Sequence, residues 1–422
     1  MATSDPKALD LDYVRSQFPG LANGWTFFDN AGGSQILKGA VERINTFLFD
    51  KNVQIGGSYA VSQAAAEALY EARTAAMHLV NARRPEEIVF GNSTTALLQN
   101  LARSMHSQLS AGDEIIITVS DHESNIGPWD RLQERGVILK IWPLNKKTLS
   151  LDLADLAPLM SDRTTLVCVT HCSNILGSIN PIREIADFVH ARGAQICVDA
   201  VAYAPHRAVD VQAFDVDYYV FSLYKTYGPH YALIYGKYDL LLELDTLYHY
   251  FYGRDKVPGK LEPGNPNYEL AYSTCGIVDY LVNLGEQAGE TGGPRRKIEA
   301  AYAAIAAQED ALTERLLTYL RSRNDCMIVG QSATTDNRVP TIAFRFDGRD
   351  AGELCKAMDA EKIAMRFGDF HSRRLAEYLG LTDHGGMLRV SMVHYNTLEE
   401  VDRFTAALDR ILAGQAGLAK AG

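Results

Sequence analysis

The sequence predicts an α/β protein with a large domain, built on a mostly parallel seven-stranded sheet, and a smaller α+β domain. The chain has 422 residues, which is long enough for two hydrophobic cores. Between about residues 60 and 290, short apolar strands alternate with amphipathic segments. Such alternation is typical of a parallel sheet with helices on both faces. After residue 293 the alternation ends, which predicts a second domain with a different pattern.

The large domain is predicted to span residues 21–292. Within it, segment 181–192 is expected to be a helix, because its apolar residues recur at helical spacing from Ile182 to Val189. Residues 253–267 are rich in Gly, Pro and charge, which predicts a long functional loop. The predicted strands are Glu87–Gly91, Glu114–Ser120, Ile138–Pro143, Thr165–Thr170, Gln195–Asp199, Tyr218–Ser222 and Ala232–Tyr235.

The small domain is predicted to combine residues 1–20 with residues 293–415. The Ala/Gly-rich end from Ala413 is expected to fray, with residues 416–422 as a tail. The predicted helices are Gly293–Ser322, Ala351–Glu361 and Leu398–Leu412, and the predicted strands are Thr341–Phe346, Ile363–Phe367 and Met387–Met392.

Bulk composition excludes several classes of function. A formal charge of −11 disfavours nucleic acid, whose phosphates attract basic surfaces. No apolar run approaches the roughly 20 residues that span a bilayer, and residues 1–7 lack the apolar core of a signal peptide. The six cysteines are scattered without a second ligand pair at metal spacing, so we expect free thiols in a reducing cytoplasm and no metal site.

Two strand ends carry ionisable residues that can meet one ligand. Asp199 ends the run Gln195–Asp199, and Lys225 closely follows the run Tyr218–Ser222. In a parallel sheet, strand ends open onto the ligand crevice. A lysine and a carboxylate facing each other across an aromatic ring suit pyridoxal phosphate (PLP), with lysine forming a Schiff base and aspartate pairing with the pyridine nitrogen. The alternative is a buried ion pair between the strands.

Two further strand ends carry polar residues. Ser93, Thr94 and Thr95 lie at a strand-to-helix turn, where backbone amides bind phosphate. The alternative for this turn is a simple N-cap made by Ser93 or Thr94. His122 follows the predicted strand Glu114–Ser120 and can be a base, a ligand or a flat surface for a planar cofactor, although a lone histidine is more often structural.

Asn174 and Arg389 are candidates for binding a substrate. Asn174 offers a donor and an acceptor after the strand Thr165–Thr170, with a turn-forming role as its alternative. Arg389 lies inside the apolar run Met387–Met392, and burying a guanidinium without an anion is costly. Its planar fork matches an amino-acid carboxylate, while an internal Asp or Glu partner is the alternative.

In this order the signals resemble the class V aminotransferase superfamily of fold-type I PLP-dependent transferases, and specifically its cysteine desulfurase-like branch. The resemblance runs from Phe28–Gly33 to Val393–Asp402 and covers nearly the whole chain. Its most specific pieces are residues 121–129, 170–181, 198–210 and 221–229.

The resemblance implies roles for the matching residues and PLP as the cofactor. Lys225 would form the Schiff base and move the proton at Cα, Asp199 would keep the pyridine nitrogen protonated, and His122 would stack on the ring. Asn174 and Arg389 would hold the carboxylate of a small amino-acid substrate. Phosphate contacts are implied for Ser93, Thr94, Thr95, Ser222, Tyr224 and, from the partner subunit, Asn265. The last contact implies a homodimer with shared active sites.

Three positions depart from the family pattern. Desulfurases carry a nucleophilic cysteine on a loop, and the corresponding stretch here, Arg366–Ser372, has none. The nearest cysteine, Cys355, lies in a helical pattern that favours a core position. Ala202 stands where relatives place a Gln or His that contacts the phenolic oxygen of the cofactor, and Tyr224 replaces the usual histidine before the lysine.

We therefore expect a PLP-dependent lyase that acts at Cβ of a small α-amino acid, a C–S lyase or desulfurase-like enzyme. The alternative is a β-decarboxylase or decarboxylative aldolase that forms an enamine from an aspartate-like substrate. Racemisation and transamination begin with the same deprotonation at Cα and stay open. A non-catalytic scaffold that binds a sulfur-transfer partner is disfavoured, because Lys225, Asp199, His122 and Arg389 are all present.

Overall fold

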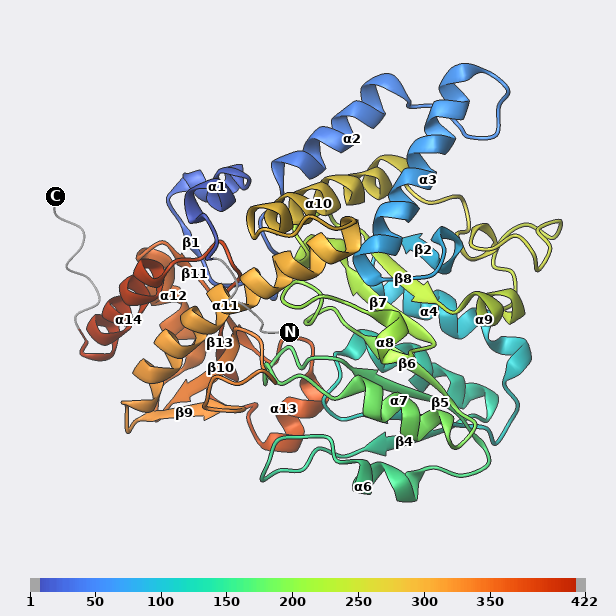
Figure 1. The fold of residues 1–422 in the computed structure, drawn as a ribbon. Helices are drawn as coiled ribbons and strands as arrows, with labels where there is room; N and C mark the ends of the chain where they lie inside the picture. The colour runs from blue at the N-terminus through green and yellow to red at the C-terminus, as the bar shows by residue number, and fades with distance from the viewer. Residues whose placement is uncertain (1–7, 415–422) are drawn as a thin grey trace.

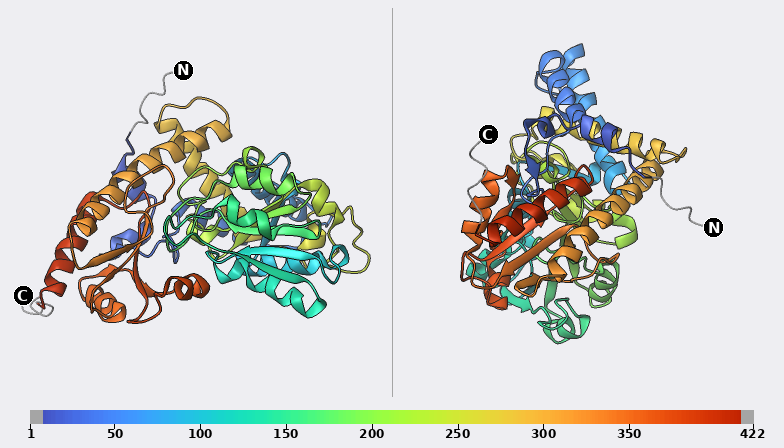
Figure 2. Two further views of the ribbon diagram at one scale, coloured as in Figure 1. Left: turned by 90° about the horizontal axis from the view of Figure 1, so that it is seen from below. Right: turned by 90° about the vertical axis from the view of Figure 1, so that its left-hand side faces the viewer.

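The computed structural model describes residues 8–414 and contains two lobes (Figure 1). The lobes separate clearly when the protein is seen from below, with the seven-stranded sheet in one and the C-terminal strands and helices in the other (Figure 2, left). The predicted tail 416–422 and residues 1–7 lie outside the described residues.

The large sheet confirms the predicted mostly parallel seven-stranded architecture. Six strands share one direction, and β8 runs antiparallel to both of its neighbours. In sheet order, the strands are β2 (Ile88–Gly91), β8 (Ala232–Gly236), β7 (Tyr218–Ser222), β6 (Gln195–Asp199), β5 (Thr164–Thr170), β3 (Glu114–Thr118) and β4 (Ile138–Trp142).

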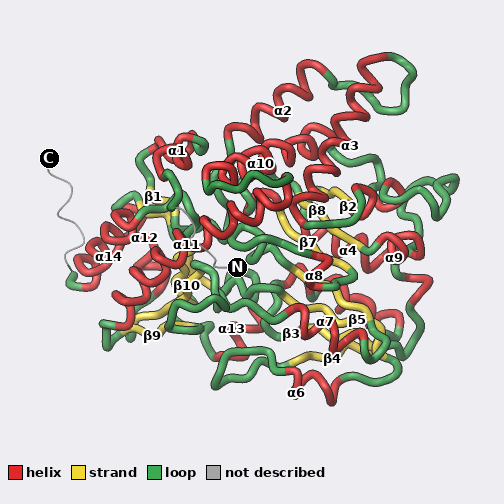
Figure 3. Tube along the Cα trace, in the orientation of Figure 1, coloured by secondary structure: helices red, strands yellow, loops and turns green. Residues whose placement is uncertain are grey.

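Helices cover both faces of this sheet, as Figure 3 shows. Successive residues of a strand point to opposite faces, so Ile196 and Val198 of β6 pack into one core while Cys197 packs into the other. The first core includes residues of α2 (Lys38–Asp50), α3 (Ala60–Val80), α7 (Ile182–His190) and α10 (Tyr268–Gln287). The second includes residues of α4 (Thr94–Ser104), α5 (Gly127–Asp130) and α9 (Tyr238–Glu243). Two short helices, α6 (Leu153–Leu156) and α8 (Val211–Phe214), complete the domain.

The small domain packs helices against a four-stranded antiparallel sheet. Its core joins Phe344, Leu388 and Phe404, all buried, from two strands and the last helix. That helix begins with a capping box, in which Thr397 and Glu400 satisfy each other's backbone amides. In sheet order, the strands are β12 (Arg366–Gly368), β13 (Met387–Ser391), β10 (Thr341–Phe346) and β9 (Cys326–Val329). The helices of the C-terminal part are α11 (Pro294–Arg321), α12 (Ala351–Ala360), α13 (Arg373–Leu379) and α14 (Leu398–Leu412), while α1 (Leu11–Ser16) lies in the N-terminal segment.

The predicted strand Ile363–Phe367 is wrong as a single element, because its two halves join different sheets. β11 (Ile363–Ala364) pairs in parallel with β1 (Thr26–Phe27), and β12 pairs with β13. An apolar run reports burial but not a change of partner, so sequence could not locate the break. The sequence did not predict β1, which has two residues, or β9, most of whose residues are exposed or only partly buried.

The N-terminal segment contacts both domains: Val14 and Phe18 belong to the first core of the large domain, while Arg15 reaches the C-terminal part of the chain. Arg15 donates to the Tyr395 carbonyl at 2.7 Å and lies 3.1 Å from the Glu400 carboxylate. The pairing of β1 with β11 extends this association past residue 21. The division into 21–292 and 1–20 with 293–415 stays a proposal. Within residues 8–414, no helix is long and apolar enough to cross a membrane.

Candidate active site

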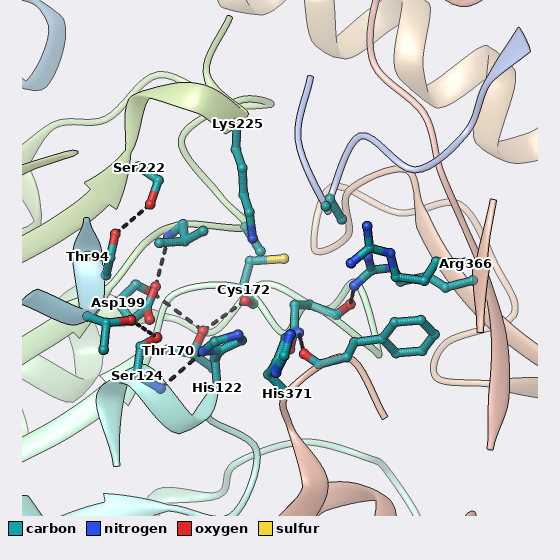
Figure 4. Close-up of a pocket in the computed structure, with 18 of the residues that line it drawn as sticks. Thr94, His122, Ser124, Thr170, Cys172, Asp199, Ser222, Lys225, Arg366 and His371 are labelled. Atoms are coloured by element: carbon teal, nitrogen blue, oxygen red, sulfur yellow. Dashed lines mark hydrogen bonds between the residues drawn. The ribbon is translucent and has the colours of Figure 1, made fainter. Parts of the chain in front are cut away.

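A cavity of about 670 Å³ lies between the two domains and collects ten of the eleven predicted site residues. Strand ends and turns of the large sheet supply one wall, while β12, the loop after it and strand β13 supply the other. Figure 4 shows Lys225, Asp199 and His122 on the first wall and Arg366 and His371 on the second. The ten residues are Ser93, Thr94, Thr95, His122, Asn174, Asp199, Ser222, Tyr224, Lys225 and Arg389; Asn265 does not line the cavity.

Lys225 and Asp199 face the cavity without forming the direct ion pair considered as the alternative. Among residues 8–414, no hydrogen bond or salt bridge links the Lys225 ammonium to another group. Burial and the charge of Arg389 lower the pKa of Lys225 to about 8, against the opposing effects of Asp199 and Asp29. The Asp199 carboxylate accepts the Val201 amide at 2.9 Å, and burial raises its pKa to about 6. Each group therefore lacks the charged partner that its burial calls for.

His122 presents a neutral imidazole to the cavity. Its Nδ1 accepts the Ser124 amide at 3.1 Å. Burial, followed by the charges of Lys225, His371 and Arg389, lowers the pKa of His122 to about 3. A buried, uncharged ring of this kind suits a stacking surface better than an acid or base.

A cluster of hydroxyl groups surrounds the N-terminus of α4. Ser93 caps the helix by accepting the Ala96 amide at 3.1 Å, so the N-cap alternative holds for this residue, which also lines the cavity. The first amides of a helix have no intrahelical acceptor and attract anions. The Thr94 and Ser222 hydroxyls lie 2.7 Å apart, and those of Thr95 and Ser124 are also 2.7 Å apart. The turn therefore offers amides and hydroxyls together, a donor set that fits a phosphate.

Tyr224 and Ala202 also line the cavity. The Tyr224 ring stacks on His230 with centroids 4.8 Å apart. Burial raises the pKa of Tyr224, while Ser222 beside its hydroxyl acts in the opposite direction. Ala202 contributes only a methyl group, so the cavity has open space at this position.

Arg389 is buried and has an internal acidic partner, Asp29, as its alternative interpretation allowed. Its Nη2 lies 3.1 Å from the Asp29 carboxylate, and its Nη1 donates to the Asn174 carbonyl at 3.1 Å. Its Nε is buried without a hydrogen-bond partner among the described residues. Burial lowers the pKa of Arg389 to about 10. The Nε donor of Arg389 is therefore left unsatisfied among the described residues.

Asp29 bridges two arginines. Arg366 lies opposite Arg389 in the β12–β13 register, and like charges placed in this way repel. The other Asp29 oxygen lies 2.8 Å from Arg366, whose side chain is 51% exposed and lines the cavity. The Asp29 carboxylate thus faces two guanidinium groups, so the group of three side chains keeps one excess positive charge.

Asn174 holds the loop after β12 against the large domain. Its Nδ2 donates to the Phe370 carbonyl at 2.9 Å, and its Oδ1 accepts the Ser372 hydroxyl at 2.8 Å. The amide oxygen is therefore engaged, and one amide hydrogen stays available for a substrate carboxylate.

The loop has an unusual backbone where it crosses the cavity. Phe370 and His371 are consecutive non-glycine residues with φ of 55° and 59°. Left-handed residues of this kind cost about 1–3 kcal/mol each and cluster at functional sites. The side chain of His371 lines the cavity.

No thiol near the cavity has the environment of a nucleophile. Cys172 lines the cavity, and burial raises its pKa to about 12. Cys355 is buried, hydrogen-bonded to the Met365 carbonyl at 3.2 Å, and its pKa is raised to about 11. A reactive cysteine needs a lowered pKa, so neither fits that role. Within residues 8–414, no three His, Cys, Asp or Glu side chains gather as a metal site.

Asn265 lies in the turn before α10, away from the cavity of its own chain. It has φ of 69° and follows Gly264, which has φ of 83°. Its Oδ1 accepts the Tyr248 hydroxyl at 3.2 Å. The carboxylate of Glu262 holds the start of this turn, 2.6 Å from Arg73.

The sequence did not single out four residues of the site. Ser124, Arg366 and His371 line the cavity, and Asp29 contacts two arginines that line it. Ser124 and His371 stand in motifs that were recognised, without a pattern that marked the individual residue. Asp29 meets Arg389 across 360 positions of the chain, which no local signal reveals.

Comparison with known proteins places this geometry in a family. The family model for class-V aminotransferases matches residues 26–404. The aminotransferase-like protein FGM3 of Gibberella zeae is 41% identical over 96% of this chain and 99% of its own length. The cysteine desulfurase-like protein ustD of Aspergillus flavus is 35% identical over 96% of this chain and 91% of its own length.

A solved structure agrees with these relatives. The cysteine desulfurase CsdA from Escherichia coli superposes with a TM-score of 0.82 at 26% identity, covering 96% of this chain and 99% of that chain. The predicted fold-type I architecture is thereby confirmed. The chain belongs to the class V aminotransferase family, in its cysteine desulfurase-like branch, and is a pyridoxal phosphate-dependent enzyme.

Proposed function

We propose that the protein is a lyase that acts at Cβ of a small α-amino acid and needs no protein thiol. The observation that carries the proposal is a cavity with an unpaired lysine at one side, a free guanidinium edge at the other and no activated cysteine between them. The substrate's β-group would leave as carbon dioxide from a β-carboxylate or as sulfur dioxide from a β-sulfinate.

The residues present fit PLP at three points. The amides and hydroxyls at the start of α4 suit its phosphate, with Ser222 and Tyr224 beside them. Asp199, buried without a cationic partner, suits a protonated pyridine nitrogen, and the neutral ring of His122 suits a stacking contact. When bound, the cofactor withdraws electrons from the carbon atoms of the amino acid.

The protein's own groups would orient the substrate and move its α-proton. The Arg389 Nε edge suits the α-carboxylate, with the spare amide hydrogen of Asn174 nearby. The Lys225 amine, with a pKa of about 8, is partly unprotonated near neutral pH and so can accept the Cα proton.

The β-group would have to leave without sulfur transfer to the enzyme. The loop 366–372 lacks a cysteine, and the two nearby thiols are neutral at physiological pH. Arg366, which keeps exposed guanidinium surface in the cavity, suits an anionic β-group. Cysteine sulfinate would make the reaction a C–S cleavage, and aspartate would make it a β-decarboxylation or, with an aldehyde, an aldol addition.

Two other outcomes start from the same α-proton transfer. A racemase would return the proton to Cα, whereas an aminotransferase would deliver it to the cofactor. Both would leave the β-group in place. A non-catalytic scaffold is disfavoured, because such a protein has no use for an unpaired Lys225 beside Arg389.

We further propose a homodimer with shared active sites. Exposed apolar side chains occur on α2 and α3 and in segment 248–252, including Phe49 at 83% and Tyr250 at 96% exposure. The turn that carries Asn265 is firmly built yet does not serve its own cavity, which suits a phosphate contact in the partner subunit.

Colour and product analysis test the proposal. The purified protein should be yellow, and amino acids should shift its visible absorbance; a colourless protein that cannot be reconstituted with PLP would exclude an enzyme. Incubation with cysteine, cysteine sulfinate and aspartate, each with and without an aldehyde, then identifies the reaction. We expect sulfite or carbon dioxide release, whereas sulfide release from cysteine as the main reaction would contradict the thiol-free route.

A further inference from the structure

The loop between β12 and α13 presents one imidazole to the cavity, that of His371. In Figure 4, His371 enters the cavity from the small-domain wall while Lys225 reaches in from the large domain. The ring centroids of His371 and His122 lie 5.5 Å apart. His371 therefore shares the space in which the substrate side chain would lie.

The backbone around His371 is fixed from several sides. Its carbonyl accepts the Glu123 amide at 2.9 Å, and its amide donates to the Asp369 carboxylate at 3.1 Å. Asn174 binds the carbonyl of the preceding residue, Phe370, and the Arg389 guanidinium lies over the Phe370 ring at 4.2 Å. Such contacts hold two left-handed residues in place and so set the direction of the His371 side chain.

The His371 ring itself is free. Within residues 8–414, neither ring nitrogen has a hydrogen bond or an ion pair, although the residues on both sides are bonded. A fixed backbone with an unengaged imidazole in a cavity is the arrangement that proton transfer requires.

Other groups at the cavity are less suited to protonate Cβ. His122 has its Nδ1 occupied by the Ser124 amide and a pKa lowered to about 3, so it stays neutral. The thiol of Cys172 has a pKa raised to about 12. Lys225 is assigned to the proton at Cα.

We propose that His371 is the catalytic acid that delivers a proton to the substrate's β-carbon after the β-group has left. This inference rests on the proposed lyase function. With aspartate, the bond between Cβ and the carboxylate breaks, its electron pair stays with the substrate, and the carboxylate leaves as carbon dioxide. The imidazolium of His371 then gives its proton to Cβ, so aspartate and one proton yield alanine and carbon dioxide. With cysteine sulfinate, sulfur dioxide leaves in the same way.

The test replaces His371 by asparagine, which tolerates a left-handed backbone but cannot transfer the proton. His384→Asn is the matched control, because His384 also has a positive φ, 50°, lies in the small domain and does not line the cavity. We expect His371→Asn to slow alanine formation from aspartate or cysteine sulfinate about 100-fold or more. Exchange of the α-proton of alanine with solvent should change less than about threefold in both variants.

Chemical modification of the holoenzyme gives a readout that does not depend on turnover. Diethyl pyrocarbonate should label the free ring of His371 at least about tenfold faster than the buried rings of His171 and His394, as measured by peptide mass spectrometry. Slow labelling of His371, or unchanged alanine formation in His371→Asn, would overturn the inference.

The two proposals fail in different ways. If the wild-type enzyme forms no alanine from either acid, the proposed function fails, whatever the variants do. If the wild-type enzyme forms alanine and His371→Asn does so equally fast, only the role of His371 fails. Added imidazole should partly restore alanine formation in His371→Ala. Normal alanine formation by His371→Ala without added imidazole would also contradict the role.

Discussion

The Arg389 guanidinium lies 3.1 Å from the Asp29 carboxylate and yet keeps its Nε without a partner. Asp29 comes from the segment after β1, and Arg389 from the middle of β13. The ion pair neutralises a buried charge and fixes the plane of the guanidinium, while the Nε donor stays without an acceptor among the described residues. The ion pair with Asp29, which was the alternative to substrate binding by Arg389, is thus compatible with substrate binding.

Replacing Arg389 by lysine should weaken amino-acid binding while leaving the cofactor in place. A lysine keeps the charge but loses the planar fork, so it cannot serve Asp29 and a substrate carboxylate at once. We expect affinity to fall about tenfold or more, which corresponds to about 1.4 kcal/mol, in a titration followed by visible absorbance. Arg410→Lys, at an exposed ion pair with Glu361, is the control, and equal affinities in the two variants would contradict the assignment.

Cofactor incorporation should depend on pH through Lys225. The amine attacks the aldehyde only when unprotonated, and its pKa is lowered to about 8. The rate of PLP binding to the apoprotein should therefore rise with pH by about tenfold per unit well below 8, and level off above it. In Arg389→Met the midpoint should move to higher pH, because Arg389 is the main charge that lowers this pKa. A pH-independent rate would exclude this environment for Lys225.

Much of the large domain could be predicted from sequence because its signals are local. β6 and β7 end where their apolar runs end, and Asp199 and Lys225 follow from these positions. The turn at Ser93 likewise combines a strand end with a helix start. Each of these signals occupies fewer than about ten consecutive residues, a length over which periodicity and capping can be recognised.

Apart from Arg389, the second wall of the cavity could not be predicted, because it depends on contacts between distant segments. Asn174 and Phe370 meet across 196 positions, and Asp29 meets Arg389 across 360. The break between β11 and β12 also follows from a change of partner rather than from composition. Sequence identified Arg366–Ser372 only by what it lacks, a cysteine, whereas the structure gives the position of His371.

Removal of the nearby thiols should leave turnover unchanged. Cys355 is hydrogen-bonded to a backbone carbonyl and does not line the cavity. Turnover of cysteine sulfinate or aspartate by Cys355→Ser and by Cys172→Ala should stay within about twofold of wild type, since neither thiolate forms at neutral pH. Complete loss of turnover in Cys355→Ser, with the cofactor still bound, would indicate a persulfide route after all.

Mixed dimers should test the contribution of Asn265 across subunits. A Lys225→Ala chain and an Asn265→Ala chain are each expected to bind the cofactor poorly as homodimers. In the mixed dimer, one site combines the intact Lys225 of one chain with the intact Asn265 of the other. We expect that site to hold the cofactor normally, as measured by absorbance per dimer. Failure of the mixture to regain any cofactor would argue against shared sites.

The most direct measurement is product analysis in deuterium oxide, with aspartate or cysteine sulfinate as substrate. We predict alanine that carries deuterium at both Cα and Cβ, together with carbon dioxide or sulfite in equal amount. Recovery of the substrate with deuterium at Cα and its β-group still attached would contradict a lyase that acts at Cβ. Formation of a keto acid that keeps the β-group would contradict it as well.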